Sequence, residues 1–95
     1  MIGVTEAKYI EKYKVHLRFT DGRSGSVDLH EFIFNDHRPI FKELQNENVF
    51  HRFALEFDTI VWANGADLSP EYLYFQTFRD DQNLNEQFRK WGYIS

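Results

Sequence analysis

The residues best suited to chemistry lie between Trp62 and Glu71. A tryptophan at an expected strand end is followed by an Asn64-Gly65 turn. Two carboxylates, Asp67 and Glu71, then stand four positions apart, and paired carboxylates can divide acid and base roles when their pKa values separate. The same residues also have structural uses, because Asn-Gly turns need positive φ, Asp bonds backbone amides and Glu favours a helix start. No nucleophile or oxyanion donor accompanies them, so we expect no catalytic residue and no enzyme activity.

The four histidines do not predict a metal site. None has the i, i+4 spacing of a helical zinc pair, and the chain has no cysteine to supply a thiolate ligand. Only His30 has carboxylates close to it in sequence, at Asp28 and Glu31. Solvated side chains explain all four histidines better than ligands do, so we expect neither a metal nor another cofactor.

Charge and hydropathy limit the classes of partner. Fifteen acidic and 11 basic residues give a net charge of −4, which argues against a general phosphate-binding surface. Basic side chains gather only in the first expected hairpin, at Lys8, Lys12, Lys14, Arg18 and Arg23. The aromatic residues of that hairpin face the core instead, so we expect no direct nucleic-acid binding. No apolar run has the length of a signal peptide or a membrane span, so we expect a cytoplasmic protein without membrane contact.

The elements that position these residues begin with an antiparallel hairpin. Apolar and polar residues alternate from Tyr13 to Thr20, and Asp21-Gly22 marks the following turn. A three-residue loop pairs Phe19 with Arg23 and puts glycine at the left-handed position of a bulge. It also places Leu17, Val15 and Tyr13 opposite Gly25, Val27 and Leu29. We prefer this register because a slip of one residue would turn the apolar face to solvent.

The rest of the chain predicts further short elements. An earlier strand covers Val4–Tyr9, and short helices follow Pro39 and Asn46. A second hairpin has its turn at Asp58-Thr59, with Phe53 and Phe57 on the inner face. Ser69-Pro70 starts a helix that carries the aromatic residues up to Phe78, and an amphipathic helix ends near Gly92.

Together these elements predict an α+β fold in the order β-β-β-α-α-β-β-α, with an antiparallel sheet of two hairpin units and an extra C-terminal helix. We expect one domain over residues 1–95, composed of a core at 2–78 and a helical extension at 79–95.

Three motifs resemble a known bacterial family. They are Leu17-x-Phe19-x-Asp21-Gly22 with Val27-Asp28-Leu29, then Ile40-Phe41-x-x-Leu44 with Phe50, then Trp62-x-Asn64-Gly65-Ala66-Asp67-Leu68-Ser69-Pro70-Glu71-x-Leu73-Tyr74. Their order and spacing resemble the domain of unknown function 2442 over about residues 2–75. Ala63 departs from the family pattern, where many relatives carry proline, and the Asp58-Thr59 turn lacks a glycine often found there.

The resemblance implies a small α+β domain without an established activity. Some relatives are fused to a helix-turn-helix domain, and others are encoded beside a second small protein in what resembles a toxin–antitoxin pair. The residues after Phe78 are too few for a helix-turn-helix. In a regulator, this chain would therefore correspond to the half that does not bind DNA.

Aromatic residues make up 18% of the chain, and seven of them follow Glu71. Because one small core does not need so many, we expect a non-enzymatic protein-interaction module that self-associates as a homodimer. The alternative is a regulatory component of a toxin–antitoxin or transcription-regulator system that binds a cognate protein partner. The candidate interaction surface comprises Trp62, Asn64, Asp67, Glu71, Tyr74, Phe78, Phe88, Trp91 and Tyr93.

Overall fold

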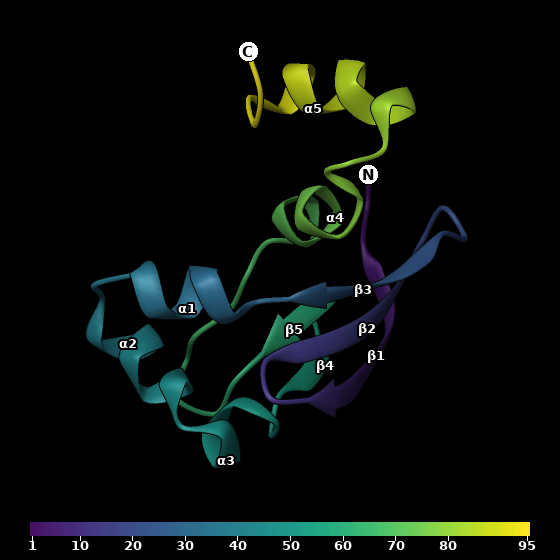
Figure 1. Cartoon of the computed structure of the whole chain (residues 1–95). Coiled ribbons are helices and arrows are strands. Elements are labelled where there is room, and N and C mark those ends of the chain that lie inside the picture. Colours follow the sequence, from purple (N-terminus) through teal and green to yellow (C-terminus); the bar gives the residue numbers. More distant parts are fainter.

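The computed structural model describes residues 1–95 as two antiparallel sheets with short helices around them (Figure 1). The first sheet has three strands in the order β1-β2-β3. Their bounds are Val4–Glu11, Lys14–Phe19 and Ser24–Asp28. The fold is therefore α+β, as the sequence predicts.

The predicted register of the β2–β3 hairpin is confirmed. Leu17 pairs with Gly25 and Val15 pairs with Val27, and Gly22 has a φ of +88° in the connecting loop. Alternation then directs the apolar side chains of β2 to the core and its polar side chains to solvent. β1 extends beyond the predicted end at Tyr9, because pairing with β2 continues as far as Glu11.

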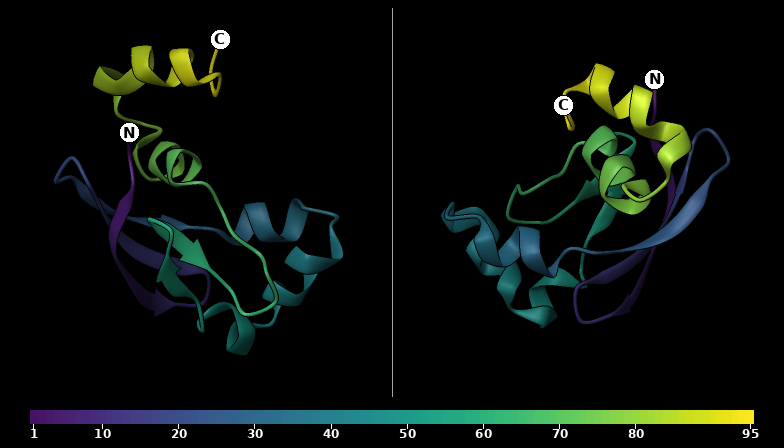
Figure 2. Two further views of the ribbon diagram at one scale, coloured as in Figure 1. Left: turned by 180° about the vertical axis from the view of Figure 1, so that it is seen from behind. Right: turned by 45° about the horizontal axis from the view of Figure 1, so that its top comes forward.

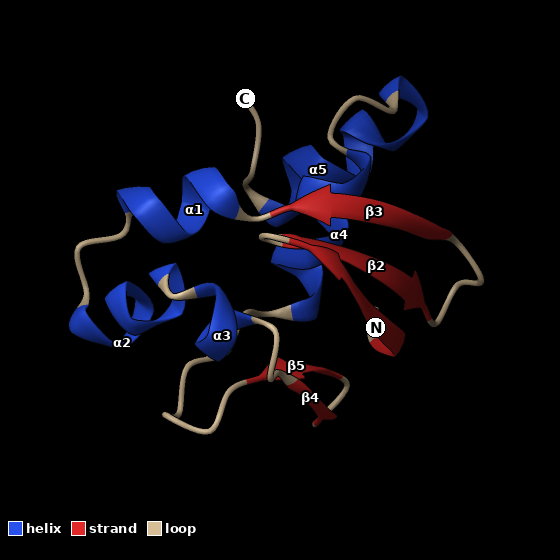
Figure 3. Cartoon of the chain, turned by 60° about the horizontal axis from the view of Figure 1, so that its bottom comes forward, coloured by secondary structure: helices blue, strands red, loops and turns tan.

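Three short helices and a 3₁₀ turn connect the two sheets (Figure 3). They are α1 (His30–Asn35), α2 (Pro39–Lys42), η1 (Glu43–Gln45) and α3 (Glu47–Phe50). Pro39 begins α2, and the Asn46 side chain accepts the Asn48 N–H at 2.9 Å, as predicted. α1 was not predicted from the sequence, because Ile33 is its only buried residue and one buried residue gives no periodic pattern. The Asp28 carboxylate starts this helix by accepting the His30 N–H at 2.9 Å.

A two-stranded sheet follows, formed by β4 (Ala54–Glu56) and β5 (Thr59–Val61). The predicted turn at Asp58-Thr59 is wrong by one residue, because Glu56 pairs with Thr59. The turn residues are Phe57 and Asp58, with φ of +54° and +63°, the two positive angles of a type I′ turn. The shift removes Phe57 from the inner face, and its reason lies in Thr59, whose buried hydroxyl donates to the Leu68 carbonyl oxygen at 2.5 Å.

The last part of the chain contains α4 (Pro70–Phe78), the 3₁₀ turn η2 (Gln82–Leu84) and α5 (Asn85–Trp91). Ser69 caps α4 by accepting the Tyr72 N–H at 3.1 Å, and Gly92 ends α5 with a φ of +86°, both as predicted. α4 packs against β3, while α5 lies on the side of α4 away from the sheets (Figure 2). No helix has the length and apolar character that crossing a membrane requires.

A glycine in β3 allows α4 to approach the sheet. A Cβ at Gly25 would lie 2.8 Å from Cγ2 of Thr77 and 3.3 Å from Cε1 of Phe78. Real Cβ atoms do not approach other atoms as closely as 2.8 Å, so only glycine fits without a shift of the Thr77 side chain or of the helix. Elements from both halves of the chain contribute to one cluster of 19 buried apolar side chains, from Val4 to Phe88.

Candidate functional site

The segment from Trp62 to Glu71 is the main candidate from the sequence, but its best-bonded side chains stabilise the fold. The Trp62 side chain is buried, and its Nε1–H donates to the Phe50 carbonyl oxygen at 2.8 Å. The Asn64 side-chain amide donates to the Ile40 carbonyl oxygen at 2.9 Å and accepts the Ala66 N–H at 3.0 Å. These bonds tie the segment to α3 through Trp62 and to α2 through Asn64, which gives both residues a structural role.

The two carboxylates of this segment do not form a pair. Asp67 is exposed and takes part in an isolated β-bridge with Val61, while Glu71 lies in the first turn of α4. Neither carboxylate forms a hydrogen bond or an ion pair with another group of the chain. Glu71 therefore has only the favourable position at a helix start that the sequence indicates.

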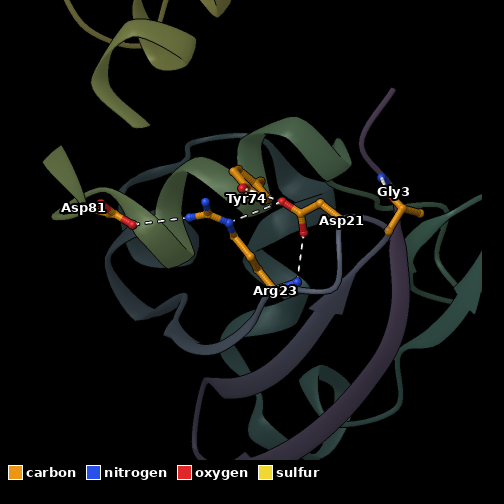
Figure 4. A network of polar contacts seen from close by, with 6 residues as sticks. Gly3, Asp21, Arg23, Tyr74 and Asp81 are labelled. Carbon is orange, nitrogen blue, oxygen red and sulfur yellow. Dashed lines mark hydrogen bonds and ion pairs between the residues drawn. The ribbon is translucent and has the colours of Figure 1, made fainter. Parts of the chain in front are cut away.

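A polar network that sequence analysis missed is built around Tyr74 (Figure 4). The buried Tyr74 hydroxyl donates to Oδ2 of Asp21 at 2.6 Å. Arg23 lies between two acids, with Nε 3.7 Å from Asp21 and Nη1 3.4 Å from Oδ2 of Asp81. The network thus joins the β2–β3 loop to α4 and to the connection after α4. The two contacts that join its halves, Tyr74–Asp21 and Arg23–Asp81, span 53 and 58 residues, so no local pattern could have revealed it.

The electrostatics of this network make Tyr74 a hydrogen-bond donor. Burial, together with the hydrogen bond to Asp21, raises the pKa of Tyr74 to about 12. The phenol therefore keeps its proton throughout the neutral range and does not serve as a base there. A cavity of about 640 Å³ adjoins the network, with apolar walls from Ile2, Leu84 and Trp91. The Asp21, Arg23 and Tyr74 side chains in its lining are bonded to one another, so the network acts first as a link between elements.

The C-terminal aromatic residues of the candidate surface pack against one another. Phe88 is fully buried, and its ring meets the Phe75 ring edge-on with centroids 5.0 Å apart, while the Tyr93 ring stacks on the Phe75 ring with centroids 4.9 Å apart. Trp91 and Phe78 are partly buried and both contact the Tyr74 ring. Most of the aromatic area that sequence analysis assigned to a partner is used within the chain, and residues 79–95 pack back onto α4.

The most exposed aromatic side chain lies elsewhere, at the tip of the β4–β5 hairpin. Phe57 is 90% exposed and has a left-handed backbone conformation, which is rare for a bulky residue. Leu55 on β4 and Ile10 on β1 are also exposed large apolar residues, 42% and 46%. β1 packs against β4 and β5, and the Val4 N–H donates to the Asp58 carbonyl oxygen at 2.8 Å, so the hairpin tip lies beside the start of β1 and Ile10 lies toward the other end of that strand. The only sequence signal for this tip was a turn without glycine.

The histidines lie apart from one another. His30 stacks on Phe34 at 4.2 Å, and His16 Nδ1 lies 3.2 Å from the Ser26 hydroxyl. His51 Nδ1 is 3.1 Å from the Glu47 carbonyl oxygen. No three histidine or acidic side chains come together in a group that could hold a metal ion.

The family described as protein of unknown function DUF2442 matches residues 4–79, which contain every motif noted above. This chain belongs to that family. Membership confirms the resemblance inferred from the sequence and leaves the function open, because the family is defined without one. No curated protein matches the chain.

A solved structure shares the fold of this DUF2442 protein. It is the crystal structure of "Putative DNA Binding Protein NE0471" from Nitrosomonas europaea ATCC 19718, with a TM-score of 0.72 and 11% sequence identity. The likeness covers 95% of this chain and 61% of the other, so this chain spans about three fifths of that protein's length. At this identity the likeness establishes a common fold.

The comparison corrects one expectation. We expected no direct nucleic-acid binding, and the likeness to a protein described as DNA-binding overturns that exclusion. The net charge was a weak reason for that exclusion, because a net charge does not describe how charges are distributed over the surface. On the outer face of the first sheet, Lys8, Lys14 and Arg18 are exposed and form no ion pair within the chain.

Proposed function

We propose that this DUF2442 chain is a non-catalytic protein-interaction module that acts in the cytoplasm and self-associates through the tip of the β4–β5 hairpin. The observation that carries the proposal is Phe57, which combines 90% exposure with a φ of +54°. A left-handed conformation costs an L-residue about 1–2 kcal/mol, which Asn or Gly at the same position would largely avoid. Strain of this kind is typical of functional positions.

An exposed phenylalanine also has the properties of an interface anchor. Aromatic side chains bring a large apolar area into a contact and lose little conformational entropy when they are fixed there. The exposed side chain of Leu55, two residues before Phe57 on β4, would extend the apolar contact. Charged residues beside them, Glu56 and Asp58, would form a polar rim, which is the usual arrangement of a small interface.

Light scattering and sedimentation of the wild type and of Phe57→Asn test this proposal. We expect the mass of the wild type to rise toward that of a dimer across the micromolar range and Phe57→Asn to stay monomeric. Phe34→Asn is the matched control, because Phe34 is 41% exposed on α1 and should leave the association unchanged. A wild type that is monomeric throughout would refute the self-association.

The regulator alternative has a separate observation in its favour. The solved structure with this fold is described as a putative DNA-binding protein and is longer than this chain. Under this alternative the module is the partner-binding component of a transcription-regulator or toxin–antitoxin system. Co-purification with the protein encoded beside it would support the alternative, and a chain that purifies alone would not.

Direct contact with DNA can be examined in the same preparation. Binding of a duplex oligonucleotide by the chain alone, weakening steeply with salt, would indicate contacts to phosphates. Lys14→Gln with Arg18→Gln removes two cations from the outer sheet face and should reduce that salt dependence. Shifts that appear only with the protein partner would place DNA contact outside this chain.

A further inference from the structure

A groove is lined by the edge of β3, by α1 and by α4. Its volume is about 820 Å³. β3, Leu29 and the start of α1 contribute one wall from Ser26 to Phe32, and Tyr72, Gln76 and Thr77 of α4 contribute the other. The groove lies on different elements from the β4–β5 tip, so it is a second surface of the protein.

The β3 wall is an unpaired strand edge. The Phe19 N–H donates to the Arg23 carbonyl oxygen and the Leu29 N–H donates to the Tyr13 carbonyl oxygen, both at 2.9 Å. These bonds at the two ends of the hairpin show that odd-numbered residues bond to the partner strand, because paired positions alternate. The backbone N–H and C=O groups of Ser24, Ser26 and Asp28 therefore point away from β2. No group of the chain outside the β2–β3 ladder bonds to them.

The charges that line the groove are predominantly negative. Asp28, Glu31 and Asp80 have no ion-pair partner, whereas Asp36 is already paired with Arg38 at 2.6 Å. The one guanidinium in the lining belongs to Arg79, and it lies over the Phe75 ring and donates to Gln76. Carboxylates without ion-pair partners around a free strand edge favour a cationic occupant with backbone groups of its own.

We propose that this groove binds an extended, lysine- or arginine-rich segment of a partner protein, which adds to β3 as a fourth strand. Strand addition supplies backbone bonds at Ser26 and Asp28, and alternate side chains of the segment face α4 and solvent. Basic side chains of the segment reach Asp28, Glu31 and Asp80. A helix cannot use the strand edge, because its own backbone groups are bonded internally.

Fluorescence anisotropy with a labelled nonapeptide of alternating lysine and valine tests the proposal at low salt. We expect saturable binding to the wild type, and a loss of about tenfold or more with Ser26→Pro, since proline removes the outward N–H that the ligand needs. Edge strands tolerate proline where the N–H faces outward, so the β2–β3 ladder should remain. Ser24→Pro is the matched control, because Ser24 has the same outward orientation on β3 but lies outside the groove lining, and it should bind like the wild type.

A charge test keeps the proposal falsifiable if Ser26→Pro fails to fold. The double variant Glu31→Gln/Asp80→Asn keeps the shapes of both side chains and removes their charges. It should bind the peptide several-fold more weakly than the wild type at low salt, and the difference in affinity should decrease as salt is added. A peptide with glutamate in place of each lysine should not bind. The proposal is overturned if the wild type does not bind the lysine peptide, if folded Ser26→Pro binds it unchanged, or if both peptides bind equally.

Discussion

Replacing Gly25 by alanine should destabilise the fold through a single close approach. The added methyl would meet Thr77 Cγ2 at 2.8 Å and Phe78 Cε1 at 3.3 Å, both on α4. Overpacking of this kind lowers the free energy of unfolding by about 1–3 kcal/mol. Alanine also reduces the entropy of the unfolded chain, which raises the free energy of unfolding by about 0.4–1 kcal/mol. We expect a net loss of roughly 1–2 kcal/mol, which corresponds to about 5–15 °C in Tm for a domain of this size.

A double-mutant cycle identifies the atom responsible. Thr77→Ser removes Cγ2 and keeps the hydroxyl, which donates to the Leu73 carbonyl oxygen at 2.7 Å. In that background Gly25→Ala should cost less by about 0.5 kcal/mol or more, because one of the two clashes is absent. Urea unfolding monitored by far-UV circular dichroism measures all four proteins of the cycle.

Ser26→Ala serves as the control, because its side chain lies at the next position of β3 on the exposed face. We expect a change within about 0.5 kcal/mol. Gly25→Ala as stable as the wild type would contradict the packing of α4 on β3. A cost that is the same in both Thr77 backgrounds would show that Cγ2 is not the obstacle.

Further predictions concern stability at other positions. At concentrations too low for the wild type to associate, Phe57→Asn should raise Tm, because the ring is 90% exposed and Asn tolerates the left-handed conformation at a gain of about 0.5–1 kcal/mol; a lower Tm under those conditions would contradict the strain. The pKa of Tyr74 is raised to about 12 in the fold, so this residue stabilises the fold fully below pH 10 and loses that contribution as the pH rises from about 10 to 12. In Tyr74→Phe, the free energy of unfolding should therefore fall less steeply over that pH range. Unfolding series at pH 9, 10 and 11 measure this, and a shallow slope remains because burial also raises the pKa of Tyr13 and of Tyr72. Trp62→Phe should cost about 1–3 kcal/mol in urea unfolding, because the Phe50 carbonyl oxygen loses its donor; an unchanged midpoint would show that water replaces it. Ser69→Ala should cost about 1 kcal/mol through the lost cap of α4, and Ser69→Asp should restore most of it.

Short sequence patterns predicted those parts of the fold that depend on a few neighbouring residues. The register of the first hairpin followed from alternation and from a glycine at the left-handed position, and the starts of α2 and α4 followed from Pro39 and from Ser69-Pro70. α1 was missed because only one of its six residues is buried, which leaves no period to detect. The turn of the second hairpin was misplaced because Phe57 and Asp58 adopt positive φ without the usual glycine.

The candidate site was less predictable from sequence than the fold. The aromatic content indicated a surface in the last third of the chain, yet Phe75 and Phe88 bury each other there. The Tyr74–Asp21 bond and the Arg23–Asp81 pair join positions more than fifty residues apart, and spacing along the chain carries no information about such contacts. The free edge of β3 emerged only after the register and the position of α4 were known.

The sequence by itself determined the α+β class, the family, the first hairpin and the helix caps, because turn stereochemistry and capping bonds act between residues a few positions apart. Only the tertiary structure decided which aromatic residues stay exposed. Residues 79–95 cover α4 and Phe57 projects from a turn, and both outcomes depend on how separate elements pack. Burial is a property of the assembled surface, so composition can count aromatic residues but cannot say where they meet solvent.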